Sequence, residues 1–357
     1  MNRTILTALA GSTLLLGAVT SATASAAPTH QAATRHSVRV CANAPAGYAA
    51  CQAKVVVDST GKPLATSGPT GNNPADVRSA YNLTAANSTA TVAIIDAYDD
   101  PTAEADLGVY RSQFGLPACT TSNGCFKKVN QAGGSTPPKA NPGWATEISL
   151  DLDMVSATCP GCHILLVEAT SNSFANLGAG VNYAAGVPGV AAISNSYGGS
   201  DSASSSAYNH PGIAITASTG DAGYGVESPA SYPTVIAVGG TTLNKSGSTW
   251  TESAWTGAGS GCSTLNAKPA WQTAATQCSG KANADVSAVA DPQTGVSIYD
   301  STRYQGRAGW QVYGGTSASA PIIASVYAMG GNLAGYPASY TWAHSSGLKD
   351  VTTGANG

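Results

Sequence analysis

Short runs of β-branched residues alternate with longer helix-compatible stretches between residues 92 and 238, and this order strongly constrains the fold. Strands separated by helices along a sequence are typical of a mostly parallel sheet that helices cover on both faces. We therefore predict an α/β fold with strands at residues 92–95, 163–167, 190–194, 213–217 and 235–238. The expected helices are the stretches 103–114, 144–156 and 174–185.

Polar residues follow three of the expected strands. Sites in open parallel sheets lie beyond the carboxyl ends of the strands. Asp96 follows the first run, Ser196-Tyr197-Gly198 follows the third, and Gly220-Asp221 follows the fourth. These are the three places where that rule predicts a functional site.

A glycine pair and a serine stand directly before an apolar stretch near the end of the chain. The segment is Gly314-Gly315-Thr316-Ser317, and the apolar run continues to Ala328. Because the glycines permit a sharp turn, we expect Ser317 at the positive end of a buried helix, which is a suitable position for a nucleophile. A serine that only caps a core helix is the alternative.

A serine nucleophile needs a proton acceptor, and the five histidines are poor candidates. His30 and His36 lie in the N-terminal segment, His163 begins an expected strand, and His210 and His344 lie in polar stretches. None stands in a glycine-rich strand-to-helix setting. A histidine base is therefore not expected, although the sequence alone leaves His210 open.

Two acids on the expected helix 144–156 offer a different base. Glu147 and Asp151 are four residues apart and share one face of that helix, whereas Asp153 points elsewhere. A solvated pair of acids is the alternative, but like charges at this spacing repel each other. Held together in a cleft, such a pair shares one proton, so that one member can be an ionised base at acidic pH.

The N-terminus has the three parts of a secretory signal: a charged start, an apolar run from Ile5 to Val19, and the small residues Ala24-Ser25-Ala26. We predict a signal peptide at residues 1–26, a short leader and linker at 27–74, and one α/β domain at 75–357. No second apolar run reaches the length of a membrane span. We therefore expect a secreted, extracellular protein without a membrane partner.

Eight cysteines support export, because an even number in an exported chain predicts disulfides. The 16 basic and 19 acidic residues give a net formal charge of -3, which argues against a nucleic-acid partner. The pair 159 and 162 could also be a redox or metal motif, but without a second such motif a structural bond is favoured. The cysteines stand in sequence-local pairs, and the four expected bonds are Cys41–Cys51, Cys119–Cys125, Cys159–Cys162 and Cys262–Cys278.

Taken together, three segments resemble the sedolisins, the serine-carboxyl peptidases with a subtilisin-like fold. They are Gly315-Thr316-Ser317 with Pro321, the helix segment 147–151, and Ser-Thr-Gly-Asp-Ala-Gly at 218–223. The resemblance continues through intervening segments, in the family's order, from about residue 75 to the end of the chain. It implies a subtilisin-like domain at 75–357 and a peptidase that acts on peptide or protein substrates.

The resemblance also implies a role for each matching residue. Ser317 is the expected nucleophile, Glu147 its general base, and Asp151 the residue that orients and tunes Glu147. Asp221 is expected to stabilise the oxyanion together with the backbone N–H of the serine, which requires a protonated carboxyl and predicts an acid optimum. The substrate is expected to add a strand along Ser196, Tyr197 and Gly198. Ser319 is the second choice for the nucleophile.

Three features depart from the family pattern. The leader is much shorter than the family's pro-domain, so we do not expect it to inhibit the enzyme. The segment around Asp350 and Val351 resembles the start of the family's structural calcium loop, but the given sequence ends before the later ligands. Asp96 stands where a subtilisin keeps its triad aspartate. No organic cofactor is implied, and a monomer is expected.

Two alternatives to a serine-carboxyl endopeptidase remain. One is a subtilisin-type enzyme that uses Asp96, a histidine and Ser317, and a histidine base would lose activity below pH 6 to 7. The other is a non-catalytic relative that only binds peptides. An acid-range peptidase assay separates all three.

Overall fold

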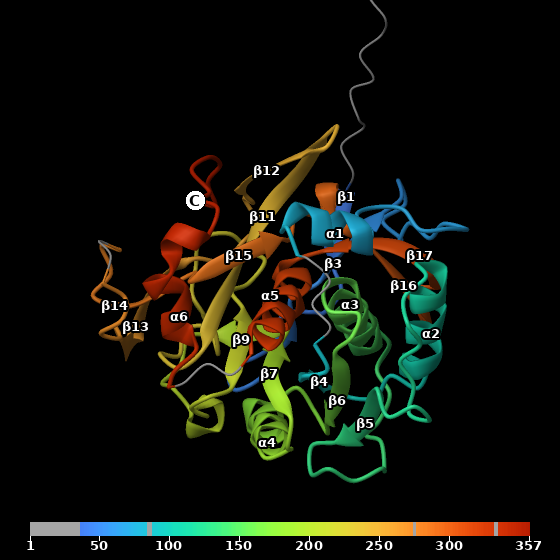
Figure 1. Ribbon diagram of the computed structural model, residues 1–357, viewed down its shortest axis with the longest axis horizontal. Helices are drawn as coiled ribbons and strands as arrows, with labels where there is room; N and C mark the ends of the chain where they lie inside the picture. Colours follow the sequence, from blue (N-terminus) through green and yellow to red (C-terminus); the bar gives the residue numbers. More distant parts are fainter. Residues whose placement is uncertain (1–35, 84–87, 274–275, 332–334) are drawn as a thin grey trace, which may run out of the picture. The chain divides into compact units, whose positions relative to one another are not determined.

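A central sheet of eight strands organises the residues that the computed structural model describes, which are 36–83, 88–273, 276–331 and 335–357 (Figure 1). Its order is β12-β11-β9-β7-β4-β6-β5, with β15 also paired to β11, and only the β11–β12 pairing is antiparallel. The mostly parallel α/β fold is therefore confirmed. The strands are β4 (Thr91–Ala97), β5 (Phe126–Asn130), β6 (His163–Ala169), β7 (Val190–Asn195), β9 (Ala214–Ser218), β11 (Ile236–Ser246), β12 (Thr249–Ala254) and β15 (Val286–Val289).

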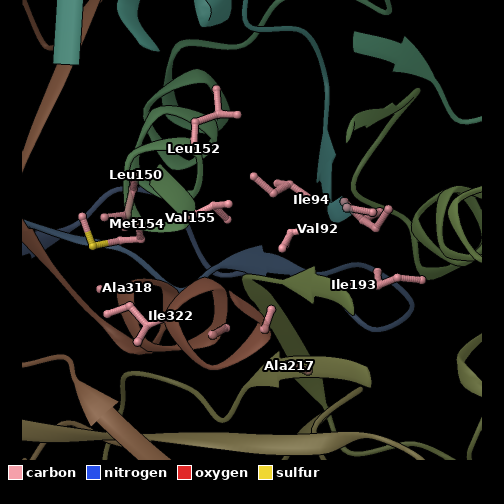
Figure 2. Packing of buried hydrophobic residues seen from close by; sticks show 14 of the residues in the cluster. Val92, Ile94, Leu150, Leu152, Met154, Val155, Ile193, Ala217, Ala318 and Ile322 are labelled. Carbon is pink, nitrogen blue, oxygen red and sulfur yellow. The ribbon is translucent and has the colours of Figure 1, made fainter. Parts of the chain in front are cut away.

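Helices cover both faces of this sheet. On one face, α3 (Pro142–Thr158) and α5 (Thr316–Gly330) pack against each other and against the middle strands. Figure 2 shows Val155 of α3 beside Val92 and Ile94 of β4. The other face is covered by α4 (Phe174–Ala185), where Gly180 lies against Ile95. Because successive strand residues point to opposite faces, Asp96 shares the α3 side with Val92 and Ile94.

The starts of α3 and α5 follow from their local sequences. The Asn141 side chain caps α3 by accepting the amides of Gly143 and Trp144, and Pro142 occupies the first turn, which tolerates proline. The helix thus begins two residues before the predicted start. At α5 the preceding residue is Gly315, whose φ of 99° is a conformation that glycine adopts readily.

Smaller elements complete the described structure. Three further sheets have the orders β1-β3-β17-β16, β10-β8-β2 and β13-β14, and all their pairings are antiparallel. Three more helices lie outside the two main layers. The bounds are β1 (His36–Arg39), β2 (Ala50–Cys51), β3 (Lys54–Val57), β8 (Tyr197–Ser200), β10 (Glu227–Ser228), β13 (Gly261–Ala267), β14 (Gly280–Asn283), β16 (Val296–Tyr304), β17 (Arg307–Gly314), α1 (Pro74–Ala80), α2 (Ala103–Gln113) and α6 (Ala338–Ala343).

The N-terminal segments differ from their predicted organisation. The expected signal peptide, residues 1–26, lies outside the described residues. The expected leader and linker, 27–74, is described from His36 onward, and its strands belong to the same compact unit as the rest of the described chain. β3 pairs with β17, and β2 pairs with β8. Residue 75 is therefore not a structural boundary, because hydrogen bonds to distant strands hold the leader in place.

Four disulfides are present in the described structure, so the expectation of disulfides is confirmed. They join Cys41 to Cys51, Cys119 to Cys125, Cys159 to Cys162 and Cys262 to Cys278. Among the described helices, none combines the length and the apolar character needed to cross a membrane.

Candidate active site

Ser317 lies in the first turn of α5 and is fully buried. Its hydroxyl donates to the carbonyl oxygen of Ser196 at 3.1 Å. Its backbone amide has no acceptor within the helix, as is usual in the first turn, and donates to the carbonyl oxygen of Gln52 at 3.0 Å. The helix start therefore already holds a peptide carbonyl against the serine.

Glu147 and Asp151 project from α3 toward this serine. Both side chains are fully buried, and the Ser196 hydroxyl donates to Oδ1 of Asp151 at 2.7 Å. In the described part of the chain, neither Glu147 oxygen has a hydrogen-bond partner of good geometry. Burial raises the pKa of Glu147 well above its ordinary value, the carboxyls of Asp151 and Asp96 raise it further, and the nearby Ser317 hydroxyl lowers it. Burial also raises the pKa of Asp151, which the bond from Ser196 partly offsets.

Asp96 adds a third acid to the pair. It lies at the carboxyl end of β4, is fully buried, and neither of its oxygens has a hydrogen-bond partner among the described residues. Burial raises its pKa well above the ordinary value, and the negative charges of Asp151 and Glu168 raise it further. Three carboxyls thus meet at one edge of the sheet. Asp153 points away from them, and its carboxylate accepts the amide of Tyr299 at 2.9 Å.

Asp221 lies beside the first residue of α5. Its Oδ1 accepts the backbone amide of Thr316 at 2.7 Å and the Thr316 hydroxyl at 3.0 Å, whereas its Oδ2 is buried without a described partner. A β-carbon at Gly315 would collide with both this Oδ2 and the Gln52 carbonyl oxygen, so glycine permits the close approach. Burial raises the pKa of Asp221 to about 6, although the bond from the Thr316 amide lowers it.

The expected substrate-binding segment, Ser196 to Gly198, runs from the residue after β7 into β8. Its partner along that edge is the chain's own β2, with Ala50 opposite Gly198 and Cys51 opposite Tyr197. The pairing continues one residue further, because the Gln52 amide donates to the Ser196 carbonyl at 3.1 Å. The segment can therefore bind an extended strand, and the leader supplies one.

The Gln52 side chain bonds to two charged side chains that no sequence motif indicated. The guanidinium of Arg39 donates to its Oε1 at 3.1 Å, and its amide nitrogen donates to the Glu227 carboxyl at 2.5 Å. Burial raises the pKa of Glu227 to about 7. The positive charge of Arg39 lowers this pKa, and the negative charge of Asp221 raises it. Arg39, Gln52 and Glu227 come from three separate segments, so no local motif identifies this group.

Asp221 also lines a cavity of about 460 Å³. Its lining includes Asp221, Trp255 and Lys54, which is two residues after Gln52. The Lys54 ammonium lies 5.1 Å from the centre of the Trp255 ring. The chain that follows Gln52 therefore reaches this cavity at Lys54.

The other candidate residues have partners elsewhere. The Ser319 hydroxyl donates to the carbonyls of Ala288 and Val289, both at 3.0 Å. His210 bonds to Asn182 and Ala207, beside α4. His163 begins β6 and His344 stacks on Tyr340, and neither lies at the carboxyl edge of the sheet. These three histidines therefore lie away from Ser317, whereas the carboxyls of Glu147, Asp151 and Asp221 lie close to it.

The expected calcium segment contributes one acid. Asp350 is exposed, Val351 is half-buried, and Lys349 donates to the Ala80 carbonyl. Among the described residues, no three or more His, Cys, Asp or Glu side chains gather to hold a metal. Calcium usually takes six to eight oxygen ligands, so one carboxylate does not by itself make a site. Calcium binding stays a prediction.

Comparison with known proteins gives concordant matches. Residues 131–352 match the Subtilase family. Kumamolisin of Bacillus sp. (strain MN-32) is 29% identical over 316 residues, which are 76% of this chain and 54% of kumamolisin. Xanthomonalisin of Xanthomonas sp. (strain T-22) is 32% identical over 161 residues, which cover 38% of this chain and 19% of that protein. The chain thus spans about half the length of kumamolisin and less of xanthomonalisin.

A solved structure shares the fold. Pseudomonas sedolisin (serine-carboxyl proteinase), complexed with two molecules of pseudo-iodotyrostatin, superposes with a TM-score of 0.67 at 24% identity. The match covers 81% of this chain and 90% of that one. The subtilisin-like architecture predicted from the sequence is therefore confirmed.

Proposed function

We propose that this chain, which belongs to the subtilase family and to the sedolisin family of serine-carboxyl peptidases, is a serine endopeptidase that works at acidic pH. One observation carries the proposal: Ser317 lies in the first turn of a buried helix, close to the buried carboxyls of Glu147 and Asp151. An imidazole base would have to come from elsewhere, whereas Glu147 and Asp151 already face the serine.

In the proposed mechanism Ser317 attacks the peptide carbonyl and Glu147 accepts its proton. Asp151 shares a proton with Glu147, and Ser196 holds the Asp151 carboxyl in place through its hydroxyl. Two adjacent carboxyls cannot both ionise readily, so the pair keeps one proton and one negative charge over an acidic range. The Ser317 hydroxyl favours the charge on Glu147. Glu147 then returns the proton to the leaving amine.

Asp221 and the Ser317 amide are the proposed oxyanion donors. The charge that develops on the substrate carbonyl needs preorganised hydrogen bonds. A carboxylic acid donates one only when it is protonated, and the raised pKa of Asp221, about 6, makes that form available below pH 6. Its Oδ2 is the oxygen without a partner, so the proton would sit there. The same requirement supports activity at acidic pH.

The substrate is proposed to bind as a strand along Ser196, Tyr197 and Gly198, as β2 does. The cavity beside Asp221 leaves room for the chain after the cleaved bond. Room on both sides of the bond supports cleavage within a peptide rather than at its end. Secretion remains part of the proposal, supported by the signal-like residues 1–26 and the four disulfides.

A peptidase assay with purified protein at pH 3 to 5 tests the proposal. We expect cleavage of a quenched fluorescent peptide, no detectable cleavage by Ser317→Ala, and a loss of at least ~10³-fold in Glu147→Gln, where the triad works as a unit. Ser319→Ala is the matched control and should stay active, because its hydroxyl donates to the carbonyls of Ala288 and Val289 in β15 and not to the carboxyls around Ser317. An optimum above pH 7, or a fully active Glu147→Gln, would refute the carboxyl mechanism.

A further inference from the structure

The contacts of the Gln52 side chain bear on which substrates the proposed peptidase accepts. β2 pairs antiparallel with β8, the Gln52 amide donates to the Ser196 carbonyl, and the Gln52 carbonyl accepts the Ser317 amide at 3.0 Å. The Ser317 amide is a proposed oxyanion donor, so a carbonyl bonded to it lies where the attacked carbonyl of a substrate belongs. The Gln52 side chain therefore marks the place of the substrate side chain directly before the cleaved bond.

Glu227 meets the donor end of the Gln52 side chain. The Gln52 amide nitrogen donates to Oε2 of Glu227 at 2.5 Å. Two glycines leave room for this carboxyl: a β-carbon at Gly198 would collide with Oε2, and one at Gly220 would lie 2.8 Å from Oε1. The β-carbon at Gly198 would also come within 3.2 Å of the Gln52 amide nitrogen. Both glycines therefore permit the contact between the two side chains.

Arg39 meets the acceptor end of the same amide group. Its guanidinium donates to Oε1 of Gln52 at 3.1 Å. A primary amide carries one acceptor oxygen and one donor nitrogen, and this pair of charged side chains supplies a partner to each. A methionine of the same length would leave both partners unsatisfied, which is costly where the bound side chain is as enclosed as Gln52, 1% exposed.

The charges of these two side chains also disfavour a basic residue. A lysine bound in place of Gln52 would bring its ammonium toward the Arg39 guanidinium. Burial raises the pKa of Glu227 to about 7, although Arg39 lowers it, and Asp221 adds to the rise. Near pH 4, where the peptidase is proposed to act, this carboxyl is mostly protonated. It can then still accept a hydrogen bond through its carbonyl oxygen, but it offers no negative charge to a cation.

We propose that Glu227, together with Arg39, makes this peptidase select glutamine over apolar and basic residues of similar length directly before the cleaved bond. The inference rests on the peptidase function proposed above and adds the side chain that a good substrate carries. Sites that hydrogen-bond a substrate group discriminate strongly against analogues that lack it, because their own polar groups are then left unpaired.

The test uses purified protein near pH 4 and three quenched fluorescent peptides that differ only in one residue, which is Gln, Met or Lys. Mass spectrometry identifies the bond that is cut. We expect kcat/KM for cleavage after Gln to be at least ~10-fold higher than after Met or Lys. Glu227→Met and Arg39→Met should each remove most of this advantage. Glu227→Gln keeps an acceptor without a charge and should retain it.

Glu104→Met is the matched control. The Glu104 carboxylate lies on α2 and bonds to Thr121, so this variant should keep the parent's preference. Equal kcat/KM for the three peptides in the parent, or a preference for Lys, overturns the inference and leaves the proposed function standing. A glutamine preference that survives in Glu227→Met also overturns it. If Glu227→Met cleaves no peptide, Arg39→Met decides, and a preference retained there contradicts the inference. A parent that cleaves neither these peptides nor a mixture of random peptides overturns the proposed function and the inference with it.

Discussion

At the scale of single residues, Asp221 is expected to set the upper limit of the active pH range. Its pKa is about 6, and only the protonated acid can donate to the oxyanion. Asp221→Asn supplies a donor that needs no proton, while the amide oxygen can still accept from Thr316. We expect kcat/KM to be ~10-fold lower than in the parent, a smaller loss than the ~10²-fold or greater loss caused by a missing oxyanion donor. We also expect the activity of this variant no longer to fall near pH 6.

The measurement is kcat/KM from pH 3 to 8 for the parent and for Asp221→Asn. Asp221→Ala serves as the comparison, because it removes the donor and should be much less active at every pH. If Asp221→Asn keeps the parent's pH curve, the fall in activity near pH 6 belongs to another group and the oxyanion role of Asp221 is wrong.

The sequence could place some of these residues and not others. Glu147 and Asp151 were predictable because helical spacing alone puts them on one face, and Ser317 because a glycine pair precedes its helix. Gln52, Arg39 and Glu227 were not, because they meet only when segments 13 to 175 residues apart come together. The side chain of Asp96 was placed at a strand end, but its nearness to Asp151 depends on how α3 packs on β4.

At the scale of elements, the junction of β17 and α5 should tolerate no side chain. Gly315 has a φ of 99°, and a β-carbon there would meet the Gln52 carbonyl oxygen, Oδ2 of Asp221 and, at 3.1 Å, the α-carbon of Ala53. We expect Gly315→Ala to lower the free energy of unfolding by at least ~1 kcal/mol and to abolish activity. Thermal unfolding and the peptide assay measure the two effects.

Gly330→Ala, at the other end of the same helix, is the matched control. A β-carbon there has open space around it, and alanine favours a helix over glycine by about 0.5–1 kcal/mol. This variant should be as stable as the parent or slightly more so. If the two substitutions changed thermal stability and activity equally, the close contacts at Gly315 would not explain the loss.

Sequence patterns predicted the long elements better than the short ones. The runs that became β4, β6, β7 and β9 are β-branched and bounded by turn residues, and the expected helices lie within a few residues of α2, α3 and α4. Strands of two to four residues, such as β2 and β3, are too short to show an alternation of apolar and polar residues in the sequence. Their pairing with β8 and β17 depends on partners far along the chain, so the leader resembled a linker.

At the scale of the whole molecule, buried carboxyls outside the catalytic group set how stability depends on pH. Burial raises the pKa of Asp100 to about 6, of Asp300 to about 7 and of Glu168 to about 8. In the unfolded chain these groups titrate near pH 4. Between pH 4 and 8 the folded protein therefore binds more protons than the unfolded one, and its stability falls as the pH rises.

We accordingly expect the described fold to be most stable near pH 4 and to lose stability progressively toward pH 8. A rise of two to three pKa units in one such group corresponds to roughly 3–4 kcal/mol, and each kcal/mol shifts Tm by about 2–4 °C in a domain of this size, so Tm should be higher at pH 4 by at least ~5 °C. Calorimetry of Ser317→Ala avoids self-cleavage during the scan. Adding Asp300→Asn to that variant removes one titrating carboxyl from β16, at a site bonded to Thr146 and Thr302, and should flatten the slope. A Tm that is higher at pH 8 than at pH 4 would mean that these carboxyls are ionised in the folded protein. The assumption that buried carboxyls are protonated at acidic pH, on which the proposed acid activity depends, would then be wrong.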